Sequence, residues 1–250
     1  MAIFTIGDLH LSFGTDKPMD IFGWGNHSEK IKKNWIENVK SQDTVIIPGD
    51  FSWGMSLKET YQDFEFLNNL PGRKILSKGN HDYWWNTLTK MTKFLEENDF
   101  VNIAFLQNNS YLIENKIIVG TRGWATNNWN SEENYKILKR ENDRLKLSIQ
   151  DGIAQFGKDK EIICFLHYPP FFGKPQIIVN TKSKISTTNY KENVPEEIDF
   201  VKTMKEFGIK RCYYGHLHGE AHREAFEGKI EEIKFTLVSS DYLGFQLKKL

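Results

Sequence analysis

Residues 2–10 read AIFTIGDLH, an apolar run typical of a β-strand that ends in an aspartate and a histidine. The same arrangement recurs four times along the chain. Apolar or aromatic runs at residues 45–47, 74–76, 161–166 and 212–214 lead into GD, GNHD, H and GHLH. The parallel strands of an α/β sheet deliver their carboxyl ends to one edge, where ligands bind. The pattern therefore predicts that five distant segments of the chain converge on one site.

Helical patterns follow each of the first three strands. Apolar residues recur at helical spacing after Ser28, after a capping-box pattern at residues 56–59 and within residues 87–97. Strands that alternate with helices in this way are typical of a layered α/β domain. Because no repeat, linker or low-complexity tract marks a boundary, we expect one domain over residues 1–250.

The rest of the chain has shorter patterns. Three strand-like runs predict an antiparallel meander, and a long polar helix with a buried stripe from Tyr135 to Phe156 follows them. Residues 169–193 lack periodicity and are predicted to form a long loop, whose lysines are either a solvated face or a lid over an anionic substrate. The three runs of the predicted meander are residues 102–106, 110–114 and 116–121. We also predict a helix with proline in its first turn at residues 195–207, and two strands at residues 235–238 and 242–247.

The composition narrows the class of protein. The 33 basic residues equal the 33 acidic ones, so the formal net charge is zero. Strong binding of a nucleic-acid backbone usually needs a basic stripe and is therefore not expected. Cys164 and Cys212 lie in apolar strand-like runs and suggest no disulfide framework, which fits a reducing compartment. No apolar run is long enough for a membrane span or a signal segment, so we expect a cytoplasmic protein with no membrane partner.

The Asp, His and Asn side chains at the five strand ends are suited to divalent cations. They are hard to borderline ligands that favour Mn²⁺, with Fe or Zn²⁺ as alternatives, and no cysteine lies among them. Asp8 and His10 are two residues apart, as are His216 and His218, so a turning backbone is needed to bring each pair together. One carboxylate that bridges two cations would hold them about 3.5–4 Å apart, the separation of two-metal hydrolytic sites.

In this order, the segments GDLH, GD, GNHD, H and GHLH resemble the calcineurin-like metallophosphoesterase superfamily. Residues 49–55 (GDFSWGM) and 81–85 (HDYWW) also resemble a bacterial branch of predicted phosphohydrolases. The resemblance spans residues 8–218 and rests on the combination, since any one segment alone is a weak signal. It implies a four-layer α/β/β/α sandwich in which helices flank two mixed sheets.

The resemblance also implies roles for the residues of these segments. Asp50 would bridge two divalent metal ions, and a hydroxide between them would be the nucleophile. His81 matches the family's histidine that is not a ligand, and it would protonate the leaving oxygen or stabilise its charge. The first metal would be held by Asp8, His10, Asp50 and His218, and the second by Asp50, Asn80, His167 and His216.

Two further residues are predicted to contact substrate. Arg122 ends a strand-like run and could reach a phosphate, with a structural ion pair as the alternative. Asp82 could contact substrate or cap the following helix. The phosphoprotein phosphatases of the superfamily extend their second segment to GDxxDRG, whose later aspartate orients the catalytic histidine, and residues 49–55 lack that aspartate. A phosphoprotein phosphatase is therefore less favoured, and what orients His81 stays open.

We predict a dimetal-dependent phosphoester hydrolase, either a phosphodiesterase or a small-molecule phosphatase. A nuclease that acts on short or single-stranded nucleic acid is one alternative. A non-catalytic metal-binding scaffold is another, although His81 and every ligand position are filled. The sequence leaves open the identity of the phosphate ester, the native metals, the oligomeric state, and whether Trp53 lines a pocket or only packs.

Overall fold

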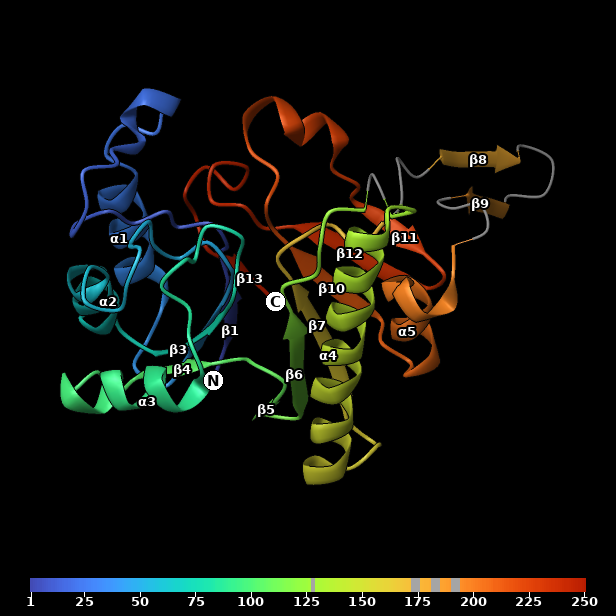
Figure 1. Cartoon of the computed structure of the whole chain (residues 1–250), viewed down its shortest axis with the longest axis horizontal. Helices are drawn as coiled ribbons and strands as arrows, with labels where there is room; N and C mark the ends of the chain where they lie inside the picture. The colour runs from blue at the N-terminus through green and yellow to red at the C-terminus, as the bar shows by residue number, and fades with distance from the viewer. Residues whose placement is uncertain (127–128, 172–175, 181–184, 190–193) are drawn as a thin grey trace.

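The computed structural model describes residues 1–126, 129–171, 176–180, 185–189 and 194–250 (Figure 1). Two sheets stand at its centre, and helices cover the outer face of each (Figure 1). This arrangement confirms the predicted sandwich of two mixed sheets flanked by helices. The helices beside the first sheet are α1 (His27–Asn38), α2 (Tyr61–Asn68) and α3 (Leu88–Glu97), and those beside the second are α4 (Glu132–Phe156) and α5 (Phe200–Glu206).

Both sheets are parallel at their centres and antiparallel at an edge. The first has the order β13-β1-β2-β3-β4, in which only β13 is antiparallel to its neighbour. It contains β1 (Ile3–Thr5), β2 (Thr44–Pro48), β3 (Arg73–Ser77), β4 (Ile103–Phe105) and β13 (Lys248–Lys249). The second has the order β11-β12-β10-β7-β6-β5, with antiparallel strands at both edges. It contains β5 (Tyr111–Ile113), β6 (Lys116–Thr121), β7 (Glu161–Leu166), β10 (Arg211–Tyr214), β11 (Gly228–Ile230) and β12 (Ile233–Leu237).

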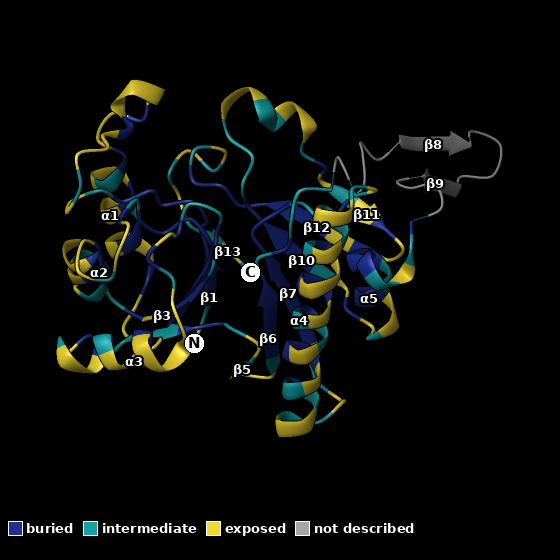
Figure 2. Cartoon of the chain, viewed as in Figure 1, coloured by how far each residue is buried: buried dark blue, intermediate teal, exposed yellow. Residues whose placement is uncertain are grey.

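The central strands are apolar on both faces because both faces are covered. In β7, Ile163 and Phe165 point into the cluster between the two sheets, whereas Cys164 and Leu166 pack under the helices. The alternation follows from the two-residue repeat of a strand. Figure 2 shows the result as buried strands inside helices whose outward faces are exposed. This packing holds the strand ends in fixed relative positions.

The predicted meander is wrong. The first of its three runs forms β4, which pairs in parallel with β3 in the first sheet, whereas β5 and β6 form an antiparallel hairpin in the second sheet. The chain therefore crosses from one sheet to the other between residues 105 and 111. Each run was recognised as a strand, but its own pattern carries no information about which sheet offers it a partner.

Three other predictions for the second half need correction. The predicted loop at residues 169–193 contains two paired antiparallel strands, β8 (Gln176–Asn180) and β9 (Ile185–Asn189). Its lysines at 174, 182, 184 and 191 lie outside the described residues. The predicted helix at 195–207 is divided into the 3₁₀ helix η2 (Glu196–Ile198) and α5, because Asp199 interrupts it and caps α5 by accepting a hydrogen bond from the Lys202 amide at 3.0 Å. Residues 242–247 turn rather than extend, and the last strand is the short β13.

The helix starts follow local hydrogen bonds. Thr87 caps α3 by accepting a bond from the Lys90 amide at 3.4 Å, as expected for a helix in this region. The Glu59 amide donates to the Ser56 hydroxyl at 3.4 Å, as the capping-box pattern predicts, but the Glu59 carboxylate accepts from the Met55 amide instead of the Ser56 amide. The pair stabilises a turn, and α2 begins only at Tyr61. Among the helices that the structure describes, none combines the length and apolar character needed to cross a bilayer.

Lys74 is a buried cation in the first sheet. Its side chain has no exposed surface, and its ammonium donates a hydrogen bond to the Leu70 carbonyl. Burial lowers the pKa of Lys74 from 10.5 to about 7. Between these two values the unfolded chain binds more protons than the folded one, so the free energy of unfolding rises with pH in this window.

We expect Lys74→Met to remove this pH dependence. The stability difference between the wild type and the variant should change by about 2 kcal/mol between pH 7 and pH 9, measured by urea unfolding. Lys93→Met is the control, because that lysine is exposed on α3. If the wild type and Lys74→Met respond to pH identically, then Lys74 is charged in the folded protein.

Candidate metal centre

The two sheets meet at the carboxyl ends of their strands. Gly7, two residues after β1, forms an isolated parallel bridge with Ser239, two residues after β12. The Gly7 amide donates to the Val238 carbonyl at 2.7 Å, and the Ser240 amide donates to the Gly7 carbonyl at 3.1 Å. Because the sheets are joined here, the ends of β1, β2 and β3 lie beside the ends of β7 and β10 (Figure 1).

Four of the predicted ligands stand on left-handed backbone. The φ angles are 58° at Asp8, 45° at His10, 51° at Asp50 and 75° at His216. Such a conformation costs about 1–3 kcal/mol at a residue with a side chain, and it collects at functional sites. Left-handed residues bend the chain at Asp8 and again at His10. This is the turning backbone that two side chains only two residues apart need in order to reach one site.

Glycines in the same segments leave room for the carboxylates. A Cβ atom at Gly79 would collide with the Asp50 carboxylate, and one at Gly215 would collide with the Asp8 carboxylate. Glycine is therefore required at these two positions by the close approach of an acidic side chain from another segment.

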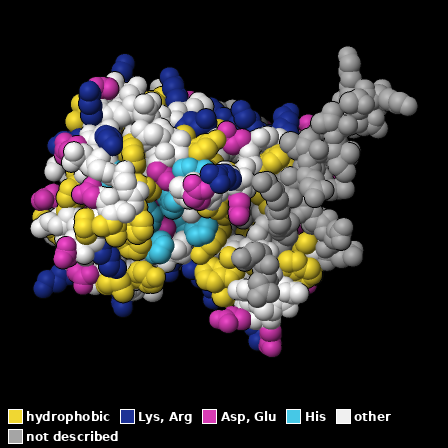
Figure 3. Space-filling view, turned by 90° about the horizontal axis from the view of Figure 1, so that it is seen from above, with side chains coloured by type: hydrophobic (Ala, Val, Ile, Leu, Met, Phe, Trp, Pro, Cys, Tyr) yellow, Lys and Arg dark blue, Asp and Glu magenta, His cyan; other side chains and the backbone are white. Residues whose placement is uncertain are grey.

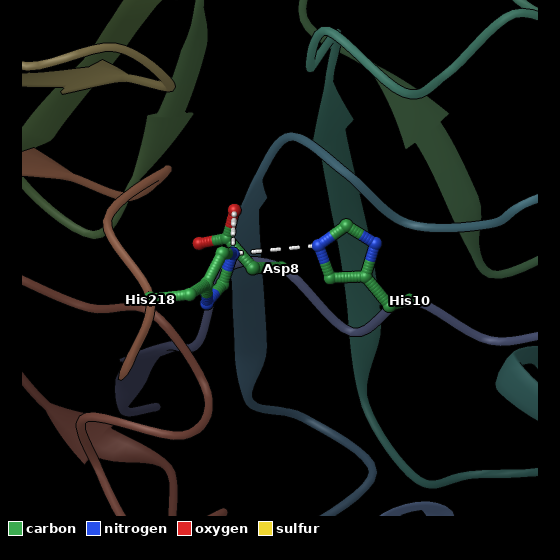
Figure 4. Close-up of side chains that lie close together, drawn as sticks. All are labelled: Asp8, His10 and His218. Carbon is green, nitrogen blue, oxygen red and sulfur yellow. Dashed lines mark hydrogen bonds and ion pairs between the residues drawn. The ribbon is translucent and has the colours of Figure 1, made fainter. Parts of the chain in front are cut away.

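The first group of side chains contains Asp8, His10 and His218, which point toward one another (Figure 4). The Nε2 atoms of His10 and His218 lie 3.4 Å apart. The Nε2 atom of His218 is also 3.5 Å from Oδ1 of Asp8, and that of His10 is 3.6 Å from Oδ2 of Asp50. These distances bring together all four residues predicted for the first metal.

The second group gathers around Asn80. Its Oδ1 atom lies 2.6 Å from Nε2 of His167 and 2.9 Å from Nδ1 of His216. The Nε2 atom of His167 is 3.5 Å from Oδ2 of Asp50. One oxygen of Asp50 therefore lies within 3.6 Å of an imidazole from each group, as a bridging carboxylate requires.

Burial and mutual charge set the protonation of these groups. Burial lowers the pKa of His10 and His167 and brings that of His216 to about 3, so these rings are neutral and keep a free lone pair. Burial and the charge of Asp8 raise the pKa of Asp50 well above its usual value. Burial also raises the pKa of Asp8, but the hydrogen bond and charge of His218, together with the other histidines around it, leave the pKa below its usual value. Divalent cations would relieve this crowding of carboxylates.

The donor set fits two metal ions. The Nε2 atoms of His10 and His218 face each other at 3.4 Å, and a cation beside them would use a lone pair of each ring once His218 has given up its proton. The set consists of carboxylates, imidazoles and one amide oxygen, which suits Mn²⁺, Fe or Zn²⁺. The two cysteines are buried inside β7 and β10 and lie away from the set.

Asp241 belongs to this site and was missed from the sequence. Its Oδ1 atom lies 2.9 Å from Nδ1 of His218, and its Oδ2 accepts a bond from the Gly219 amide at 3.0 Å. Although burial acts in the opposite direction, hydrogen bonds to Asp241 and Asp8 raise the pKa of His218 to about 10. The signal was present, because Asp241 follows the predicted strand at residues 235–238, which ends at the same edge.

We expect Asp241→Asn to weaken metal binding by about 10–100-fold, because a carboxylate on the far nitrogen of a ligand histidine orients the ring and makes it more basic. Calorimetric titration of the metal-free protein with Mn²⁺ measures the change. Asp143→Asn, on the outer face of α4, is the control. Equal affinities for the wild type and Asp241→Asn would show that His218 needs no such support.

Asp82 has a different position from the one predicted. Its carboxylate is fully buried and accepts bonds from the amides of Gly79 at 2.7 Å, Asp50 at 2.9 Å and Phe51 at 3.0 Å, and from the Trp84 indole at 3.0 Å. Burial and the charge of Asp50 raise the pKa of Asp82 to about 7. These bonds tie the GNHD segment to the GD segment. The geometry thus gives Asp82 a positioning role in place of a substrate contact or a helix cap.

Arg122 forms a structural ion pair, the predicted alternative to a phosphate contact. Its Nη2 atom lies 3.5 Å from Oε1 of the buried Glu141 of α4, and its guanidinium stacks on the Trp124 ring at 4.6 Å. It lines a separate cavity with Lys78 and Arg144, and none of the predicted ligands is among the described residues that line this cavity. The predicted contact between Arg122 and substrate stays a prediction.

His81 is held by packing instead of by a carboxylate. Its ring centroid lies 4.4 Å from that of Trp53, which also stacks on His10 at 4.9 Å. Its amide donates to Oδ1 of Asp50 at 2.8 Å. The buried Nδ1 atom of His81 has no hydrogen-bond partner among the residues that the structure describes. The chain lacks the aspartate that orients the catalytic histidine in the GDxxDRG pattern, and here the Trp53 ring packs against His81.

The fold is an α/β/β/α sandwich, and its strand ends bring together carboxylate and imidazole groups in two neighbouring clusters. A family model described as calcineurin-like phosphoesterase matches residues 1–220. The chain belongs to this family. No curated protein matches the chain.

Solved structures share the fold at low sequence identity. A phosphopantetheinyl hydrolase from Mycobacterium tuberculosis is 12% identical, with a TM-score of 0.51, and the match covers 100% of this chain and 95% of the other. A structure of TT1561 from Thermus thermophilus is 12% identical, with a TM-score of 0.52, and the match covers 99% of this chain and 97% of the other. At this identity the likeness concerns the fold alone.

Proposed function

We propose that the protein hydrolyses phosphate esters with two divalent cations that its strand-end residues hold. Family membership supports metal-dependent phosphoester hydrolysis, and the geometry adds one decisive observation. A single oxygen of Asp50 approaches an imidazole of each group, at 3.6 Å from His10 and 3.5 Å from His167. A two-metal site needs such a shared carboxylate.

The residues that would hold the first metal are Asp8, His10, Asp50 and His218, and those for the second are Asp50, Asn80, His167 and His216. When bound, the cations would supply Lewis acidity, which lowers the pKa of the attacking water and neutralises the phosphoryl oxygens. Mn²⁺ as the native metal and a cytoplasmic location stay predictions.

The chain itself would act on the leaving group through His81. Burial lowers the pKa of His81, and the positive charge of His218 lowers it further, which makes the protonated ring a stronger acid. Such a ring would give its proton to the alkoxide as the bond between phosphorus and the leaving oxygen breaks. The contact with Trp53 fixes the ring, and the bonds of Asp82 hold its segment against Asp50.

A substrate screen tests this proposal. Phosphomonoesters, phosphodiesters, cyclic nucleotides and oligonucleotides are incubated with the protein and Mn²⁺, and released phosphate or alcohol is measured. We expect turnover of small mono- or diesters that stops when Mn²⁺ is chelated. Cleavage of oligonucleotides alone would favour the nuclease, and bound metal without turnover would favour the scaffold.

A further inference from the structure

An apolar cavity adjoins the proposed metal centre. Its volume is about 420 Å³, and the hydrophobic side chains around it lie beside the cluster of histidines in Figure 3. Three imidazoles of the site line it, those of His10, His81 and His218, together with the aromatic rings of Phe22, Trp24 and Trp53. The cavity thus has two kinds of wall, one of imidazoles from the site and one of aromatic and apolar side chains.

The two walls are in direct contact. The Trp53 ring packs against both His10 and His81. The Trp24 ring meets His10 at 5.7 Å and His218 at 5.2 Å, in both cases edge to face. A group bound in this cavity would therefore touch the tryptophans and, at its inner end, the same imidazoles that surround the reacting phosphate.

Two residues of the 3₁₀ helix η1 (Met19–Phe22), Phe22 and the buried Met19, line the cavity. Phe22 lines the cavity, yet 64% of its surface is exposed. Covering an exposed aromatic side chain beside an apolar cavity with a ligand removes apolar surface from water, which favours binding. The adjoining residue Ile21 is 77% exposed and does not line the cavity, which makes it a natural comparison.

We propose that this cavity binds the organic part of the leaving group, so that preferred substrates are phosphate esters of aromatic or similarly flat apolar alcohols. The inference rests on the proposed function, because His81 lines the cavity and is the residue placed at the leaving oxygen. An alcohol bonded to that oxygen extends past His81 onto Trp53 and Phe22. Flat rings suit walls made of indole and phenyl faces.

Two pairs of esters test the proposal. Phenyl and 2-naphthyl phosphate, and their methyl diesters, have leaving groups of similar acidity but different apolar area. We expect the naphthyl ester to have a KM about tenfold lower than the phenyl ester in whichever pair is hydrolysed, because its second ring removes more apolar surface from water. Phe22→Ala should reduce this ratio to about two, Phe22→Leu should restore most of it, and Ile21→Ala should keep it.

A binding measurement separates the cavity from the reaction. 2-Naphthol is titrated calorimetrically into protein treated with EDTA, and we expect binding that is several-fold weaker in Phe22→Ala than in Ile21→Ala. Hydrolysis with equal KM values, or a ratio that Phe22→Ala leaves unchanged, would overturn this inference while the proposed function stands. Absence of hydrolysis would overturn the proposed function, and 2-naphthol that fails to bind would overturn the cavity as a site for the alcohol.

Discussion

Asp50→Asn is expected to abolish metal-dependent hydrolysis, with a loss on the order of 10³-fold or more. The substitution keeps the size of the side chain and an oxygen that can accept the His81 amide. It removes the negative charge and replaces one carboxylate oxygen with an N–H group, which cannot bind a cation. Since one oxygen of Asp50 faces both groups of imidazoles, the loss affects both metal positions at once.

The same substitution should leave the metal-free protein at least as stable as the wild type. Asp50 is buried beside Asp8, and burial together with that neighbouring charge raises its pKa well above the usual value. A neutral amide avoids this repulsion. We therefore expect the Tm of the metal-free variant to be equal or higher, while the rise in Tm that Mn²⁺ causes in the wild type disappears.

Asp63→Asn is the matched control for this prediction. Asp63 is also buried, and burial raises its pKa to about 6, but its carboxylate bonds to the Ser52 hydroxyl and the Phe13 amide, neither of which belongs to a predicted ligand. This variant should keep the Tm rise with Mn²⁺ and most of the activity. If Asp50→Asn still binds two metal ions per chain and keeps the wild-type rate, then Asp50 does not bridge the two metals.

The sequence predicts most of this site because its signal is local. Each predicted ligand lies shortly after the end of a strand, and strand ends in parallel sheets share one edge. Asp8 and His218 are separated by most of the chain, yet the pattern placed them together and the structure has them 3.5 Å apart. Asp241 follows the same rule at the end of β12, but a single aspartate after two serines has no motif around it.

What the sequence could not predict depends on contacts between distant segments. The run at residues 102–106 was recognised as a strand, but its membership of the first sheet depends on β3 accepting it as a neighbour. The apolar cavity has the same origin, because Met19 of the 3₁₀ helix η1 and Trp24, which follows that helix, meet Trp53 only in the fold. The role of Asp82 likewise depends on backbone amides of another segment.

His81→Ala is expected to keep both metals bound and to lower kcat by about 10²–10⁴-fold with an alkyl phosphate ester. The His81 amide, which donates to Asp50 at 2.8 Å, remains in the alanine variant, so the bridge keeps this bond. Among the residues that the structure describes, the lost ring packs against Trp53, His10 and Tyr83, and its Nδ1 atom has no hydrogen-bond partner. Metal content and Tm with Mn²⁺ should therefore match the wild type.

The acidity of the leaving group distinguishes proton donation from a structural role of His81. A 4-nitrophenolate leaves without a proton, whereas an alkoxide needs one, so His81→Ala should slow a 4-nitrophenyl ester far less than an alkyl ester. Tyr83→Phe is the control, since Tyr83 is exposed and its ring adjoins His81 at 6.2 Å. Equal losses for the two esters would mean that His81 does not protonate the leaving oxygen, and loss of metal would assign it to the structure of the site. A loss confined to esters with poor leaving groups would identify His81 as the residue that protonates the leaving oxygen. His81 and Trp53 both line the apolar cavity, so this proton donor would lie at the site proposed for the alcohol.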